Sequence, residues 1–96
     1  MESNMTMQEI SEIGTALGEK GTIKKLSRLI LRDLTYIRGP KELARKIGEI
    51  LLEEEMRKTG EKFDFMLDLL EWDDKQLRMF LLAYNNAAIK HDRKSK

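Results

Sequence analysis

The sequence contains no cysteine, which excludes disulfide bridges, thiolate nucleophiles and zinc sites built on cysteine. Its single histidine, His91, lies in the basic segment HDRKSK, where no serine or carboxylate is placed to form a catalytic triad with it. Its glycines form no phosphate-binding loop, because Glu19 stands where such a loop needs its second glycine. We therefore expect a non-enzymatic protein that holds no metal and no cofactor.

Long apolar runs are also missing. None approaches the roughly 20 residues that a membrane-spanning helix requires, and the N-terminus lacks the basic segment followed by an apolar run that marks a secretory signal. A cytoplasmic location is the resulting expectation. The charge-rich, glutamine-poor composition resembles that of thermophile proteins.

With 96 residues, of which 41% are hydrophobic and 36% charged, the chain has the composition of a soluble globular protein. We expect one helical domain over residues 1–96, frayed at residues 1–5 and 91–96.

Apolar residues recur at helical spacing, and no segment alternates like a half-buried strand, so the predicted fold class is all-α. The single proline, Pro40, separates two helices, because proline disfavours helical geometry before it and suits the first turn of the helix that follows. The expected architecture is a compact bundle of four main helices plus a short N-terminal helix. The predicted helices span residues 6–17, 22–37, 40–58, 62–71 and 74–90.

Two local signals bear on the first and last helices. Gly14 disfavours the N-terminal helix, and we assign no role to the GxxxG pattern of Gly14 and Gly18, which promotes helix packing within apolar membrane spans. Asp73 and Gln76 have the spacing of a capping box, which predicts the start of the last helix.

Two acidic residues interrupt apolar helix faces. Asp33 lies between Ile30 and Leu34, and Glu54 interrupts the face of the third helix. A charge in such a place must be paired or must lie at the edge of the core. We expect edge residues paired with a nearby arginine, and a specificity pair at a subunit interface is the alternative.

Charge is segregated along a chain whose net charge is only +1. Residues 19–46 hold nine bases and three acids, whereas residues 47–74 hold three bases and ten acids. A second basic block, residues 75–96, holds six bases and one acid. Nucleic-acid binding needs several cations on one surface, because each neutralised phosphate releases counterions. The first block therefore predicts phosphate contacts. The alternative is a solvated helix face, or a surface that pairs with the acidic block of the same chain at residues 49–74. The candidate nucleic-acid-binding residues are Lys24, Lys25, Arg28, Arg32, Arg38, Lys41, Arg45 and Lys46.

Residues 42–49, with the sequence ELARKIGE, resemble the opening of a helix-turn-helix motif. The resemblance covers about eight residues and then breaks, because Glu54 and Arg57 occupy later positions that must be apolar. The would-be recognition helix would also present three consecutive glutamates to phosphates. A looser arrangement, with residues 22–37 and 40–51 as the two helices, remains geometrically allowed.

The fourth predicted helix carries an acidic stripe of Asp64, Asp68 and Glu71. Carboxylates at this spacing can hold a hard cation, but a solvated face is the expected reading. The stripe can also face the basic stripe of a second subunit.

Apolar positions on two sides of short helices exceed what one small chain is expected to bury, which predicts a homo-oligomer, with a two-fold dimer as the default. The alternative is a central helix inside the monomer. The candidate interface residues are Leu52, Met56, Phe65, Leu69 and Trp72.

Two functions follow as hypotheses. The first is a nucleic-acid-associated regulator or accessory factor that binds phosphates through the basic block. The second is a protein–protein interaction module, either a self-assembling subunit or an inhibitor of a larger protein partner.

Overall fold

The structure is a computed structural model, and it describes residues 5–58 and 69–94, with the side chains of residues 5–54 and 69–94. The described part is all-α, as predicted, and contains no strand. No described helix is long and apolar enough to cross a membrane. The elements are α1 (Met7–Gly18), α2 (Lys24–Arg28), the π-helix η1 (Leu29–Asp33), α3 (Pro40–Lys58) and α5 (Asp74–Lys94).

The count of four main helices stays a prediction. Of the predicted helix 62–71, only residues 69–71 are described, and there Leu70 and Glu71 form a turn. Asp64, Asp68 and Phe65 lie outside the described residues.

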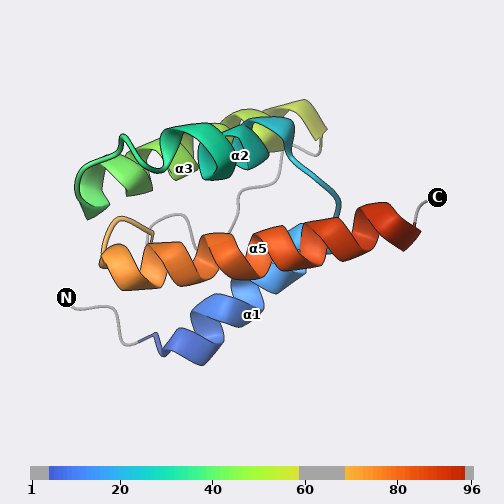
Figure 1. Cartoon of the computed structure of the whole chain (residues 1–96), viewed down its shortest axis with the longest axis horizontal. Helices are drawn as coiled ribbons and strands as arrows, with labels where there is room; N and C mark the ends of the chain where they lie inside the picture. The colour runs from blue at the N-terminus through green and yellow to red at the C-terminus, as the bar shows by residue number, and fades with distance from the viewer. Residues whose placement is uncertain (1–4, 59–68, 95–96) are drawn as a thin grey trace.

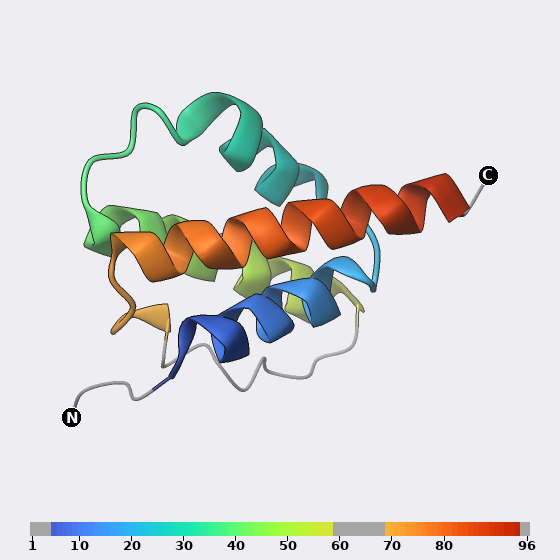
Figure 2. The same ribbon diagram turned by 60° about the horizontal axis from the view of Figure 1, so that its bottom comes forward.

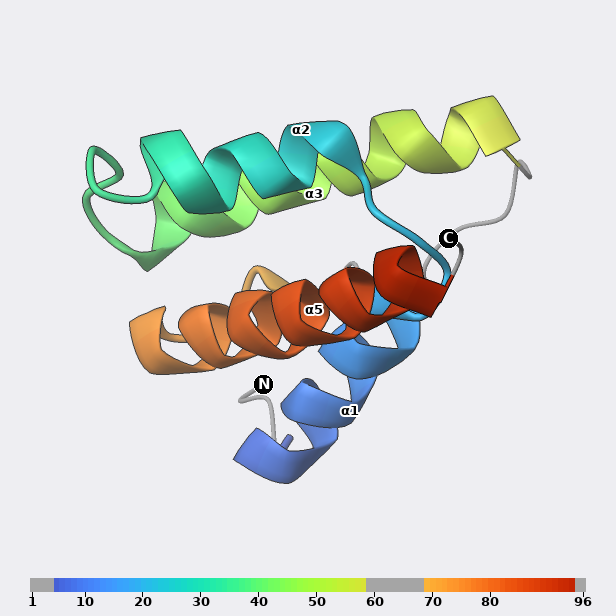
Figure 3. The same cartoon turned by 45° about the vertical axis from the view of Figure 1, so that its right-hand side comes forward.

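The helices form two groups on opposite sides of α5 (Figure 1). On one side, α2 with η1 runs antiparallel to α3, and these elements form a hairpin (Figures 1 and 3). On the other side, α1 runs along α5 in the same direction (Figure 2). Most of the core lies between these groups, where Leu43, Ile47 and Leu51 of α3 and Phe80 and Tyr84 of α5 are fully buried.

The α1 helix begins at a capping box that satisfies two backbone donors. The N–H of Glu9 donates to Oγ1 of Thr6 at 3.1 Å, and the N–H of Thr6 donates to Oε1 of Glu9 at 3.3 Å. This reciprocal pair compensates for the low helix propensity of Gly14.

The absence of a role for Gly14 and Gly18 is a wrong prediction. A Cβ on Gly14 would lie 2.5 Å from the carbonyl oxygen of Phe80, and one on Gly18 would lie 2.7 Å from Cβ of Ala87. Small residues let two helix backbones approach closely in water as well as in lipid, because the requirement is steric. The GxxxG pattern therefore forms the contact of α1 with α5, where Ala83 and Ala87 repeat the same spacing.

The predicted helix over 22–37 is shorter and changes its winding. After α2, the N–H of Leu34 donates to the carbonyl of Leu29 at 2.8 Å, which is the i→i+5 bond of a π-turn. The wider turn changes which side chains face the core: Leu29 is buried, whereas Ile30 and Leu34 are only half-buried. Asp33 is consequently exposed rather than set in an apolar face, and it forms no ion pair with any described arginine.

The α5 helix begins where the sequence predicts. The N–H of Gln76 donates to Oδ1 of Asp73 at 2.8 Å, and the N–H of Asp73 donates to Oε1 of Gln76 at 2.9 Å, which confirms the capping box. The helix continues past its predicted end at residue 90 to Lys94.

Candidate nucleic-acid interface

The fold places all eight candidate phosphate-binding residues on the α2–α3 hairpin. Four of them lie on α2 and η1, one lies in the connecting turn, and three lie in the first half of α3. Because these elements are antiparallel neighbours, residues up to 22 positions apart share one hairpin. All are exposed except Lys46, which is half-buried. We call the set the hairpin cations: Lys24, Lys25, Arg28, Arg32, Arg38, Lys41, Arg45 and Lys46.

Two hairpin cations form ion pairs with acids of α3. Nζ of Lys25 lies 2.5 Å from Oε1 of Glu53, and Nη1 of Arg45 lies 3.0 Å from Oε1 of Glu49. All four side chains are about half-exposed or more. Exposed pairs of this kind contribute roughly 0–1 kcal/mol, so phosphates can compete with the acids for these cations.

The contact line between α2–η1 and α3, which we call the seam, carries side chains of both charges. A shallow groove of about 290 Å³ lies there, floored in part by Leu29 and Ile50. Three bases and three acids line it, so the seam itself has no positive excess. The charged lining residues are Lys25, Arg28, Lys46, Asp33, Glu49 and Glu53. The Lys25–Glu53 pair agrees with the alternative that the basic surface pairs with the acidic block of the same chain. Block charges alone do not show which acids of α3 face α2.

Cations without an ion pair to a described residue lie both in the seam, at Arg28 and Lys46, and outside it. Six hairpin cations form no ion pair within the described part of the chain: Lys24, Arg28, Arg32, Arg38, Lys41 and Lys46. These side chains are the ones that the fold leaves available to an anionic partner.

The candidate interface residues fall into different environments. Leu69 and Trp72 are 1% and 2% exposed, and the ring of Trp72 packs against Phe80 with centroids 5.7 Å apart. For these two residues the prediction of a subunit contact is corrected, since one chain already buries them. Leu52 is 45% exposed. Phe65 lies outside the described residues, and Met56 is described only as part of the α3 backbone.

The two most exposed large apolar side chains of the described part lie around the end of η1. Leu31 is 81% exposed and Tyr36 is 80% exposed. Leu31 follows the buried Leu29 by two positions, and residues two apart lie on nearly opposite sides of a helix, so Leu31 faces outward.

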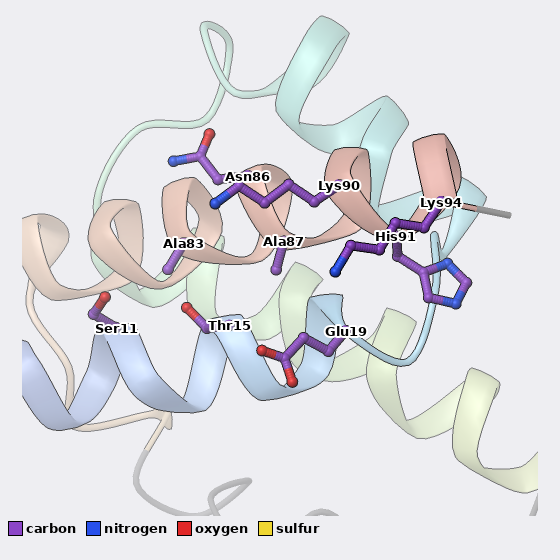
Figure 4. Close-up of a pocket in the computed structure, with 9 residues that line it drawn as sticks. All are labelled: Ser11, Thr15, Glu19, Ala83, Asn86, Ala87, Lys90, His91 and Lys94. Carbon is purple, nitrogen blue, oxygen red and sulfur yellow. The ribbon is translucent and has the colours of Figure 1, made fainter.

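A second groove, of about 640 Å³, lies between α1 and α5 (Figure 4). Hydroxyl groups of Ser11 and Thr15 lie on its α1 side with Glu19, and the small side chains of Ala83 and Ala87 leave room for it. On the α5 side it is lined by Asn86, Lys90, His91 and Lys94. The groove follows from the close approach of α1 to α5, so the sequence signal for it is the GxxxG pattern of Gly14 and Gly18.

Among the described residues, Tyr84 is the most deeply buried titratable side chain. The N–H of Ile23 donates to its hydroxyl at 2.6 Å, and Ser27 also hydrogen-bonds to it. Burial raises the pKa of Tyr84 above its usual value, and these two hydrogen bonds oppose the rise only in part. The hydroxyl thus joins α5 to the start of α2.

Comparisons with protein-family models, with curated proteins and with solved structures find no match to this chain.

Proposed function

We propose that the protein is a small, non-enzymatic, nucleic-acid-associated regulator or accessory factor that acts as a homo-oligomer in the cytoplasm. The hairpin cations contact backbone phosphates, and the complete fold is the expected bundle of four main helices plus the short N-terminal helix. The proposal rests on one observation: six cations of the α2–α3 hairpin form no ion pair with a described residue.

The physical argument is counterion release. Each cation that neutralises a phosphate of a duplex releases condensed salt ions, so binding strengthens steeply as the salt concentration falls. The mixed seam reduces this effect, because Glu49 and Glu53 remain close to the phosphates. Binding is therefore expected to be moderate in strength and to depend little on base sequence, since backbone contacts carry no sequence information.

The test is fluorescence anisotropy with a labelled DNA duplex between about 50 and 200 mM salt. We compare the wild-type protein with the double variant Arg28→Glu/Arg32→Glu and with Lys75→Glu/Arg78→Glu, which makes the same charge change at the start of α5. The first variant should flatten the salt dependence by about 2 in log–log slope, at roughly one per lost phosphate contact. Binding that is insensitive to salt, or equally affected by both variants, would remove the basis of the proposal.

A second function is favoured by Leu31 and Tyr36. Two large side chains with about four-fifths of their surface exposed are suited to anchor a protein partner. In that case the protein is an interaction module, either a self-assembling subunit or an inhibitor of a larger protein. Light scattering after size-exclusion chromatography separates the two functions: an assembly that is lost in Leu31→Ser/Tyr36→Ser but indifferent to duplex supports the interaction module.

A further inference from the structure

The fold brings the ends of two basic sequence blocks together at one end of the molecule. Oγ1 of Thr22, in the turn before α2, donates to Oδ2 of Asp92 near the end of α5 at 2.5 Å. Next to this contact, a Cβ on Gly21 would lie 3.4 Å from Cε1 of His91. The segment that leads into α2 therefore packs against the last turns of α5 (Figures 1 and 3).

This contact gathers cations that are about 70 residues apart in the chain. Lys24 lies at the first position of α2, and Lys90, Arg93 and Lys94 lie in the last turns of α5. All four are exposed, and none forms an ion pair within the described ranges. We call these four residues the basic end.

Two of the acids near the basic end already have a partner within the protein. Glu53 pairs with Lys25, and Asp92 accepts the hydrogen bond of Thr22. Glu19 lies in the groove beside Lys90 and Lys94, and Glu54 lines a small groove with Lys24. A positive excess remains, and the hydroxyl groups of Ser11 and Thr15 face the same groove as the lysines.

We infer that the basic end is a second phosphate-contacting site, continuous with the hairpin cations along the long axis of the molecule. The inference rests on the proposed function. Arg38 and Lys41 lie at the turn of the hairpin, at the opposite end of α2 and η1 from Lys24. The longest extent of the molecule is 42 Å, which is close to one turn of a DNA duplex, about 34–36 Å or 10 base pairs. The ligand is a duplex backbone, and its footprint is one turn.

Cations at the end of a helix also interact favourably with the helix dipole. A structural role of that kind would change the stability of the fold and leave duplex binding untouched, so the two readings have different measurable consequences.

The experiment compares three double charge reversals on the same fold. Lys90→Glu/Arg93→Glu alters the basic end, Arg28→Glu/Arg32→Glu alters the hairpin, and Lys75→Glu/Arg78→Glu is the control, roughly 25 Å along the same helix from Arg93. Circular dichroism first establishes that each variant is folded. Anisotropy is then measured with duplexes of about 5, 10 and 20 base pairs over a range of salt concentrations.

If the inference holds, the basic-end variant flattens the log–log salt slope by about 2, and the control leaves it unchanged. The wild-type protein gains affinity between the 5- and 10-base-pair duplexes (about half a turn and one turn), and the basic-end variant loses that gain.

Three outcomes overturn it in distinguishable ways. If only the hairpin variant weakens binding, the basic end is not part of the site and the proposed function stands. If the wild-type protein binds no duplex at low salt, the proposed function and the inference fall together. If the basic-end variant leaves duplex binding intact but abolishes binding to phosphatidylserine vesicles, the basic end contacts lipid phosphates instead.

Discussion

The N–H of Ile23 donates a hydrogen bond of 2.6 Å to the hydroxyl of Tyr84, which lies 61 residues later in the chain. Tyr84 is fully buried, and its backbone faces Gly14 and Gly18 of α1. One residue of α5 thus contacts α1 through its backbone and the start of α2 through its hydroxyl, so it couples the two groups of helices.

Removal of this hydroxyl is expected to destabilise the protein. Tyr84→Phe leaves the N–H of Ile23 buried without its acceptor, at a cost of about 1–3 kcal/mol in the free energy of unfolding. Urea unfolding followed by circular dichroism measures the change. Tyr36→Phe is the matched control, because Tyr36 is exposed and should change stability by less than about 0.5 kcal/mol. Equal effects of both substitutions would argue against the hydrogen bond.

The same hydroxyl predicts a loss of stability at alkaline pH. Because burial raises the pKa of Tyr84 in the folded protein, the folded state holds this proton more tightly than the unfolded chain does. Its contribution is fully present below the unfolded pKa of about 10 and is lost as the pH rises through the folded pKa. Unfolding curves at rising pH should show this decline in the wild-type protein and a shallower one in Tyr84→Phe. Parallel pH profiles would contradict the assignment.

Methyl groups on the two α1 glycines should disrupt the contact with α5. Gly14→Ala and Gly18→Ala force Cβ atoms into the backbone of α5, and overpacking of this kind destabilises by about 1–3 kcal/mol or more. Ala16→Leu adds a larger group on the exposed side of the same helix and should change little. Thermal unfolding of the three variants is the measurement. Wild-type stability in both glycine variants would mean that α1 does not pack as closely as described.

Leu69 should behave as a core residue and not as an interface residue. Leu69→Ala is expected to lower the free energy of unfolding by about 2–5 kcal/mol, because it leaves a cavity beside Trp72 and its neighbours. Leu70→Ala, at a position 63% exposed, is the control. Light scattering completes the test: a Leu69→Ala variant of unchanged stability that loses an assembly would restore the subunit contact.

Much of the local structure was predictable from neighbouring residues. The Asp73–Gln76 box and the Gly39-Pro40 break mark helix starts, because capping and proline geometry involve residues within three or four positions. The π-turn at η1 was not predictable in this way. A stripe of apolar residues fits an α-helix and a π-turn about equally well, and the core decides which of Leu29 and Ile30 is fully buried.

The same distinction between local sequence and tertiary contacts applies to the candidate site. The sequence by itself determined the all-α class, the helix faces and the two basic blocks, because each depends on residue type and spacing along the chain. Only the tertiary structure decided that Glu53 of α3 pairs with Lys25 of α2 across the seam, that Gly14 and Gly18 let α1 approach α5, and that Lys24 lies at the same end of the molecule as Arg93. These relationships depend on contacts between helices far apart in the chain, and such contacts are set by how the side chains of all helices fill one shared core.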